Sequence, residues 1–248
     1  MGILSSTYLI TALMTGTLSH AQEAPLINKN RYYYEKRGDI VWEVPNSEKI
    51  IALTFDDGPD PEDTPTILDL LAQYQVKATF FVVGKKVDMY PELAKREVFE
   101  GHELANHTYN HLYINKRMTE DSIHKEILKA EQTIINTTGF KPHLFRPPGG
   151  FYSENLIHVL QKTGYQMIMW SWHQDSKDWN RPGVDRIVSS VIQKTRNGDI
   201  VLLHDYVEGE TQTIEALKQI LPQLKAKGYR FVTVSELLTY RKTTTVKK

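Results

Sequence analysis

The sequence of 248 residues contains no cysteine. Disulfide bonds, thiolate metal sites and a cysteine nucleophile are therefore excluded, and any metal ion must be held by histidine and carboxylate side chains. An excess of charge is also missing, since 30 Lys and Arg residues balance 30 Asp and Glu residues. This balance argues against nucleic acid, or any other partner that is bound through bulk electrostatics.

The sequence has no apolar run that is long enough to span a bilayer comfortably. The stretch Tyr8–Leu18 has instead the length of the apolar region of a signal peptide, although no Lys or Arg precedes it. Ser19 and Ala21 place small residues at the positions expected for cleavage after Ala21. We predict that residues 1–21 are a signal peptide and that the mature protein is secreted or cell-wall associated. The alternative is a disordered tail or a short helix.

The rest of the sequence is consistent with a single domain. Residues 22–48 are polar and rich in tyrosine without a clear period, and we interpret them as a lead-in segment. Residues 49–240 contain no internal repeat and no linker-like run, and residues 241–248 form a basic tail. We therefore expect one domain over residues 49–240.

Within that domain, short apolar runs alternate with amphipathic stretches, and this alternation predicts a parallel α/β fold. The number of repeats favours a closed barrel, with a doubly wound open sheet as the alternative. One predicted helix begins with Thr64 as its N-cap and Pro65 in its first turn. The predicted strands lie within residues 50–55, 76–84, 102–107, 143–148, 165–172, 199–205 and 229–234.

Chemically reactive side chains follow these predicted strands. In both candidate folds the active site lies at the carboxyl ends of the strands, so the residues at those positions are expected to meet at one edge. They are Asp56 and Asp57, His107, Arg146, His204 and the loop after Trp172.

His107 and His111 are four residues apart, which on a helical turn would place both imidazoles on one face. A histidine pair at this spacing often lies on the surface without binding a metal. Asp56 and Asp57, with the Gly-Pro that follows them, are also typical of a turn. Together, however, the two pairs favour a metal site with two histidines and one carboxylate. A cation would offset the burial of one aspartate, and the other would be free to act as a base.

Five motifs in this order resemble those of the polysaccharide deacetylases, the NodB-homology or carbohydrate esterase family 4 enzymes. They are TFDDGP (54–59), HTYNH (107–111), RPPGG (146–150), DSKDW (175–179) and LLH (202–204). The resemblance extends from about Ile50 to Leu238. It implies a distorted (β/α)7–8 TIM-like barrel and a metal-dependent hydrolase that removes N-acetyl groups from amino-sugar polymers. Peptidoglycan N-acetylglucosamine or N-acetylmuramic acid and chitin-like oligosaccharides are the implied substrates.

The resemblance also implies roles for individual residues. Asp56 would be the general base, Asp57, His107 and His111 the metal ligands, and His204 the acid that protonates the leaving amine. Zn²⁺ is the metal expected from the family, and two histidines with one aspartate can also bind Co²⁺, Ni²⁺ or Mn²⁺.

The remaining motif residues are expected to support this chemistry. Arg146 would orient the base, and Asp178 would pair with the catalytic histidine and raise its pKa. The backbone N–H of Gly149 would stabilise the oxyanion. Trp179 and Leu202 would line the substrate groove, although core packing is an alternative interpretation of both.

One motif departs from the family. Many relatives that act on N-acetylglucosamine have an aromatic residue after the two prolines, where this sequence has Gly149. The backbone N–H is retained, but an aromatic wall beside the substrate would be lost. Two alternatives to a monomeric deacetylase of a glycan remain: a non-catalytic glycan-binding relative and a hydrolase of a small cyclic amide.

Overall fold

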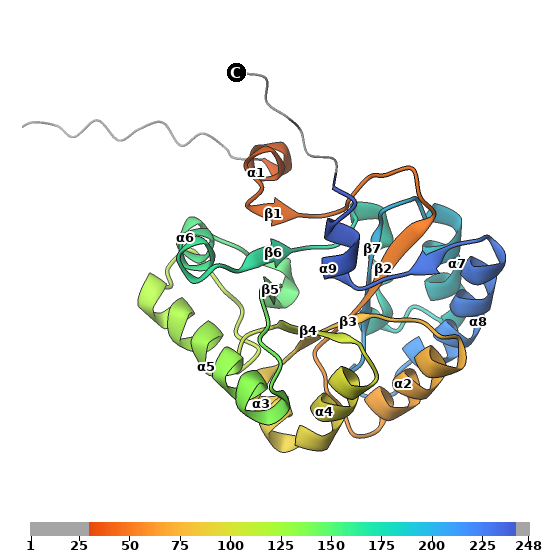
Figure 1. Ribbon diagram of the computed structural model, residues 1–248, viewed down its shortest axis with the longest axis horizontal. Helices are drawn as coiled ribbons and strands as arrows, with labels where there is room; N and C mark the ends of the chain where they lie inside the picture. The colour runs from red at the N-terminus through yellow and green to blue at the C-terminus, as the bar shows by residue number, and fades with distance from the viewer. Residues whose placement is uncertain (1–29, 242–248) are drawn as a thin grey trace, which may run out of the picture.

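The computed structural model describes residues 30–241. The predicted signal peptide and all but the first residue of the predicted basic tail lie outside these residues. Figure 1 shows a curled sheet whose helices cover its outer side. The elements are α1 (Arg31–Arg37), β1 (Ile40–Val41), β2 (Ile50–Asp56), α2 (Asp63–Gln73), β3 (Thr79–Val82), α3 (Gly84–Met89), α4 (Pro91–Phe99), β4 (Glu103–Asn106), α5 (Glu120–Thr138), β5 (Leu144–Phe145), α6 (Glu154–Thr163), β6 (Gln166–Ile168), α7 (Val184–Lys194), β7 (Ile200–His204), α8 (Thr213–Ala226), β8 (Arg230–Phe231) and α9 (Val234–Leu238).

The sheet has the strand order β1-β6-β5-β4-β3-β2-β7, with β8 added beside β2, and all of these strand pairs are parallel. Its two ends approach each other: the N–H of Val44, after β1, donates to the carbonyl of Gly198, before β7, over 2.9 Å. The predicted distorted barrel is therefore confirmed, in the form of a curled half-barrel rather than an open doubly wound sheet.

The register of the strands brings the predicted reactive residues to one edge. Asp56, the last residue of β2, is paired with His204, the last residue of β7, and with Phe81 of β3. On the other side, Asn106 at the end of β4 pairs with Phe145 of β5, and the next residues are His107 and Arg146. Parallel pairing thus places all of these groups at the carboxyl edge.

Apolar side chains fill both sides of the sheet. The outer cluster joins strands β2, β3 and β7 to helices α2, α7 and α8, with Phe55 and Leu217 among its fully buried members. The inner cluster fills the curled sheet and includes Ile50, Phe81 and, from α9, Leu237. Burial of strand β2 on both faces explains why residues 50–55 form a continuous apolar run.

Each predicted apolar run contains a strand, but the sequence did not indicate β1, which adds an edge strand beside β6. The prediction for Thr64 was wrong. Helix α2 begins at Asp63, and the Thr64 hydroxyl accepts from the Asp60 N–H and donates to Asp205 Oδ2, both over 2.7 Å. Its hydrogen bonds tie two loops together rather than cap the helix.

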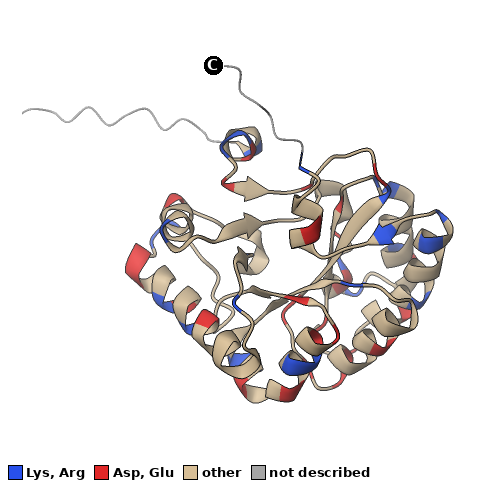
Figure 2. Cartoon of the chain, viewed as in Figure 1, with Lys and Arg blue, Asp and Glu red and all other residues tan. Residues whose placement is uncertain are grey.

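The charged side chains gather on the outer helices, with both signs interspersed, while most of the sheet carries neither (Figure 2). This is the arrangement expected for a surface with no excess charge of one sign. Within residues 30–241, none of the helices combines the length and apolar character needed to cross a membrane.

Candidate active site

A cleft of about 410 Å³ opens at the carboxyl edge of the sheet. Eight of the ten residues assigned to the site from the sequence line it, and the other two, Arg146 and Asp178, are completely buried. The lining includes Asp56, Asp57, His107, His111, Gly149, Trp179, Leu202 and His204, together with Tyr113, Gly150, Phe151, Trp170 and Asp175.

The predicted metal ligands converge. Asp57 Oδ1 lies 3.3 Å from His107 Nε2 and 3.0 Å from His111 Nε2. One nitrogen or oxygen atom from each of the three residues can be chosen so that all lie within 4.8 Å of one another. Each side chain therefore offers one ligand atom to a common point, which is the donor set of a zinc-type site with positions left for water and substrate.

The expected helical turn at residues 107–111 is wrong. Thr108 and His111 have φ angles of 66° and 55°, which a right-handed helix does not contain. Side chains take up the hydrogen bonds instead: Asn106 Oδ1 accepts from the Thr108 N–H, and the Thr108 hydroxyl accepts from the Leu112 N–H. The two imidazoles meet because the chain reverses, not because of helical spacing. Asp57 also has a positive φ of 79°, so two of the three proposed ligands sit in strained backbone.

A hydrogen bond to the far side of the ring orients His107. Its Nδ1 lies 2.7 Å from the carbonyl oxygen of Arg146, which can only accept, so Nδ1 carries a proton. In the neutral imidazole, Nε2 then presents its lone pair to the Asp57 carboxylate. Such a concentration of electron pairs requires positive charge, either a proton on each ring or one divalent cation.

The charge state of Asp57 fits the same site. Burial raises the pKa of this carboxyl, but hydrogen bonds from His107 and His111 and the charge of His107 and His204 outweigh burial and hold the pKa well below its usual range. Asp57, His107 and His111 therefore fit a divalent cation. Such a cation, when bound, acts as a Lewis acid towards water and an amide carbonyl.

Asp56 faces a different partner. Its Oδ1 accepts from Arg146 Nη1 over 2.6 Å, whereas its Oδ2 lies 3.9 Å from His107 Nε2. The Arg146 guanidinium also donates to the Thr54 hydroxyl and to the carbonyls of Ile168 and Met169. These bonds fix one oxygen of Asp56 and leave the other directed toward the metal ligands.

Burial lowers the pKa of Arg146, and the neighbouring Asp56 opposes this effect. Since an arginine remains charged in proteins, Arg146 supplies the positive charge that compensates Asp56.

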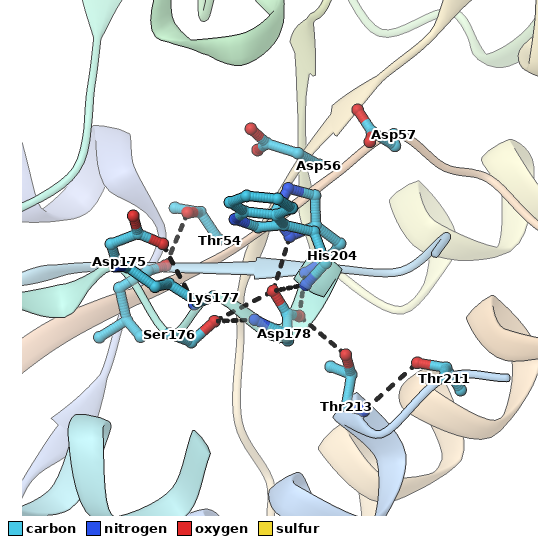
Figure 3. A network of polar contacts seen from close by, with 12 residues as sticks. Thr54, Asp56, Asp57, Asp175, Ser176, Lys177, Asp178, His204, Thr211 and Thr213 are labelled. Carbon is cyan, nitrogen blue, oxygen red and sulfur yellow. Dashed lines mark hydrogen bonds and ion pairs between the residues drawn. The ribbon is translucent and has the colours of Figure 1, made fainter. Parts of the chain in front are cut away.

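His204 is held by a buried carboxylate (Figure 3). Its Nδ1 lies 2.7 Å from Asp178 Oδ1, and its backbone N–H donates to Asp178 Oδ2 over 2.8 Å. The hydroxyls of Ser176 and Thr213 also donate to Asp178, over 3.0 and 2.8 Å. Burial lowers the pKa of His204. Its attraction to Asp178, added to its attraction to Asp57 and Asp56, outweighs burial and raises the pKa to about 9. His204 is therefore protonated near neutral pH, as a general acid must be.

The three residues assigned to substrate contact lie around these groups. Leu202 is 4% exposed and is both a member of β7 and part of the cleft, so packing and groove lining are not exclusive. Trp179 is 53% exposed, which argues against core packing. Gly149 has a φ of 64°, which favours glycine.

Sequence reasoning missed several residues of the site. The cleft is also lined by Tyr113, Phe151 and Trp170. Each lies within a few residues of a motif or a predicted strand end, so its aromatic side chain could have been recognised from the sequence as a candidate for the cleft. Thr213 gave no such signal, because its bond to Asp178 joins residues 35 positions apart in the chain.

A second group of histidine and carboxylate side chains lies elsewhere. Glu43, His173 and Asp199 also offer ligand atoms within 4.8 Å of one another. Asp199 directly precedes β7, whereas His204 ends it, so this group lies at the opposite end of that strand. The described residues thus contain two clusters whose ligand atoms lie close together but whose surroundings differ.

Comparison with known proteins identifies the family. Residues 43–168 match the family model for polysaccharide deacetylase, which is just over half of the chain. The chain belongs to the polysaccharide deacetylase family. It is 50% identical over 207 residues to a peptidoglycan-N-acetylglucosamine deacetylase of Bacillus cereus, covering 84% of this chain and 96% of the relative. It is 40% identical over 225 residues to a chitooligosaccharide deacetylase of Bradyrhizobium, covering 86% and 97% of the two chains.

Solved structures of the family show the same fold. A peptidoglycan N-acetylglucosamine deacetylase in complex with a benzamide compound matches with a TM-score of 0.79 and 35% identity, over 84% of this chain and 96% of that one. A family 4 acetyl xylan esterase from Clostridium thermocellum, in complex with a cobalt ion, matches with a TM-score of 0.71 and 38% identity, over 77% and 91%. The chain is thus a hydrolase that acts on the amide bonds of N-acetylated glycans. Deacetylases of carbohydrate esterase family 4 depend on a divalent metal ion, and Asp57, His107 and His111 are placed to hold one.

Proposed function

We propose that this deacetylase removes N-acetyl groups from the amino sugars of peptidoglycan, with N-acetylglucosamine as the favoured residue, and that it acts on chitin-like oligosaccharides of the same sugar. The observation that carries the proposal is the convergence of Asp56, His204 and the metal-ligand triad Asp57, His107 and His111 on one cleft. The similarity to deacetylases named for peptidoglycan and for chitooligosaccharides supports the choice of substrates.

The geometry suggests how the residues divide the reaction. Asp56, with one oxygen held by Arg146, accepts a proton from the attacking water through its other oxygen. A carbon–oxygen bond forms and the amide carbon–nitrogen bond breaks. Protonated His204, held by Asp178, donates to the departing amine, which leaves poorly without a proton. The products are acetate and a free amino sugar.

The developing negative charge on the carbonyl oxygen needs donors at the same place. Gly149 lies in the cleft wall with the metal triad, and we assign its backbone N–H to this oxygen. The identity of the cation is part of the proposal: Zn²⁺ is the choice for two histidines and one aspartate, and Co²⁺, Ni²⁺ or Mn²⁺ would fit the same donors. We also propose that the protein acts as an exported monomer.

Acetate release tests the proposal directly. The metal-loaded protein should release acetate from chitotetraose and from intact peptidoglycan, with one free amine formed for each acetate. A chelator should abolish the release, and Zn²⁺ should restore it. Asp56→Asn should retain the metal and lose turnover by roughly 10²- to 10⁴-fold. Normal turnover by this variant would refute the base assignment.

The same assay separates the alternatives. A non-catalytic relative would bind the oligosaccharide without releasing acetate, and a cyclic amide hydrolase would open a cyclic ureide but leave chitotetraose intact. The acid, the base and all three ligand side chains are present together, which favours catalysis over binding alone.

A further inference from the structure

The space that a side chain at Gly149 of the RPPGG motif would occupy is filled by an aromatic ring from another part of the chain. A Cβ built on Gly149 would lie 2.7 Å from Tyr113 Cε1 and 3.0 Å from the ring of Phe151. Carbon atoms do not approach so closely, so a side chain at position 149 and the present place of Tyr113 exclude each other. The space that a Cβ on Gly149 would need is therefore occupied by Tyr113, which comes from the loop after β4.

Tyr113 is positioned by ring contacts. Its ring meets His111 edge-on, with centroids 5.2 Å apart and planes at 76°. It also meets Phe151, with centroids 6.1 Å apart and planes at 61°. Edge-to-face contacts of this kind fix the orientation of an aromatic ring. One neighbour is a proposed metal ligand, so the ring stands at a defined place beside the metal triad.

Yet most of Tyr113 is not buried. The residue is 56% exposed, and within residues 30–241 its hydroxyl has no hydrogen-bond partner. A large aromatic side chain with an open face and an unused hydroxyl at the mouth of a cleft contributes little to the core. It is suited to bind a ligand that offers an apolar surface edged by hydroxyls, which describes a sugar ring.

A second exposed aromatic residue lines the same cleft near another strand of the sheet. Trp179 comes from the segment that holds His204 of β7, whereas Tyr113 and Phe151 stand over the β4 and β5 side. Both Tyr113 and Trp179 line the cleft and also an adjoining hollow that contains Lys86, Tyr206 and Glu208. They therefore stand where a chain of sugars would pass across the metal triad.

We propose that Tyr113, supported by Phe151, is a specificity-determining residue that forms the aromatic wall against which the N-acetylated sugar is placed. It replaces a side chain at position 149, and the glycine there is what gives it room. This inference rests on the proposed function for the choice of ligand, a sugar of an N-acetylated oligosaccharide.

Steady-state kinetics with chitotetraose test the inference. Tyr113→Ala should raise KM about tenfold, because an apolar contact of one ring face is lost, while kcat changes little. Tyr113→Phe, which keeps the ring and loses only the hydroxyl, should stay within about threefold of the original protein. Tyr32→Ala is the matched control: Tyr32 is 67% exposed and belongs to α1, and its removal should change neither constant.

Two results would overturn the inference. One is an unchanged KM in Tyr113→Ala. The other is a loss of kcat with a parallel loss of Zn²⁺ affinity, measured by titration, since this would mean that Tyr113 merely holds His111. Should the original protein release no acetate, the proposed function fails by itself. Equilibrium binding of chitotetraose to the Zn²⁺-loaded protein then decides the inference: about tenfold weaker binding to Tyr113→Ala supports it, and equal binding refutes it.

Discussion

In the metal triad and in the group formed by Glu43, His173 and Asp199, the ligand atoms lie within 4.8 Å of one another, but the two groups have different charged partners. In the second group, Arg31 Nη2 lies 2.8 Å from Glu43 Oε1. Asp199 Oδ2 is close to His173 Nε2, Gln174 Nε2 and the Arg196 N–H, at 3.0, 3.1 and 2.7 Å. The carboxylates of this group are therefore already paired with the Arg31 guanidinium and with N–H donors of the protein.

In the described part of the chain, no arginine or lysine lies within ion-pair distance of the metal triad. Among residues 30–241, the side-chain partners of Asp57 within ion-pair distance are the two imidazoles alone, and the neighbouring Arg146 is taken up by Asp56. The two carboxyls also differ in pKa. Burial raises the pKa of Asp199, whereas the two histidines, in their protonated form, hold the pKa of Asp57 well below its usual range. A bound cation would take the place of those protons. The comparison shows that close ligand atoms alone do not define a metal centre. The centre also requires ligand groups that are not already paired with an arginine and with hydrogen-bond donors of the protein.

The largest predicted effect on activity distinguishes His107 of the metal triad from His173 of the second group. His107→Ala removes a ligand from the metal triad, so Zn²⁺ affinity and acetate release should both fall, the latter by roughly a thousandfold or more. His173→Ala should keep most of the activity and lose about 1–3 kcal/mol of stability, since it deprives buried Asp199 of a partner. Zn²⁺ titration, acetate release and thermal unfolding measure the three quantities. Equal losses of activity in both variants would contradict the distinction.

A smaller effect concerns His204. In the original protein its pKa is about 9, so the acid remains protonated at neutral pH and the rate should fall only as the pH rises through that value. In Asp178→Asn the largest attraction is gone while burial still lowers the pKa of His204, so the fall in rate should move to lower pH. At pH 8 we expect kcat/KM to drop by about 10²-fold. Asp199→Asn is the control, and a pH profile of Asp178→Asn that matches the original would show that Asp178 does not set the protonation of His204.

The smallest effect should come from Arg31. Its pair with Glu43 is partly exposed, with a third of the Arg31 side chain open, so Arg31→Gln should cost at most about 1 kcal/mol of stability. kcat/KM should not change, because Arg31 lies in α1, away from the cleft. A loss of activity of more than tenfold would mean that the second group contributes to catalysis after all.

The sequence predicted the parts of the molecule that depend on local pattern. Helix α5 has its N-cap at Thr119, whose side chain accepts from the Ser122 N–H, and its C-cap is Gly139 in a left-handed conformation; both residues are local signals of helix ends. The reactive residues were found because parallel strands bring their carboxyl ends together.

The remaining features depend on partners distant in the chain. Thr64 is bound by Asp205, 141 residues away, and strand β1 has too few residues to show a period. The turn between His107 and His111 follows from the side chains of Asn106 and Thr108, which spacing alone does not reveal. Tyr113 acquires its place only because Gly149, from a different loop, leaves it free.

Anomalous scattering from crystals of the full chain grown with Zn²⁺ tests the central claim most directly. The account predicts a peak about 2.0–2.2 Å from an oxygen of Asp57 and from Nε2 of His107 and of His111, and no peak among Glu43, His173 and Asp199. A peak at the second group, or none at the first, would contradict it.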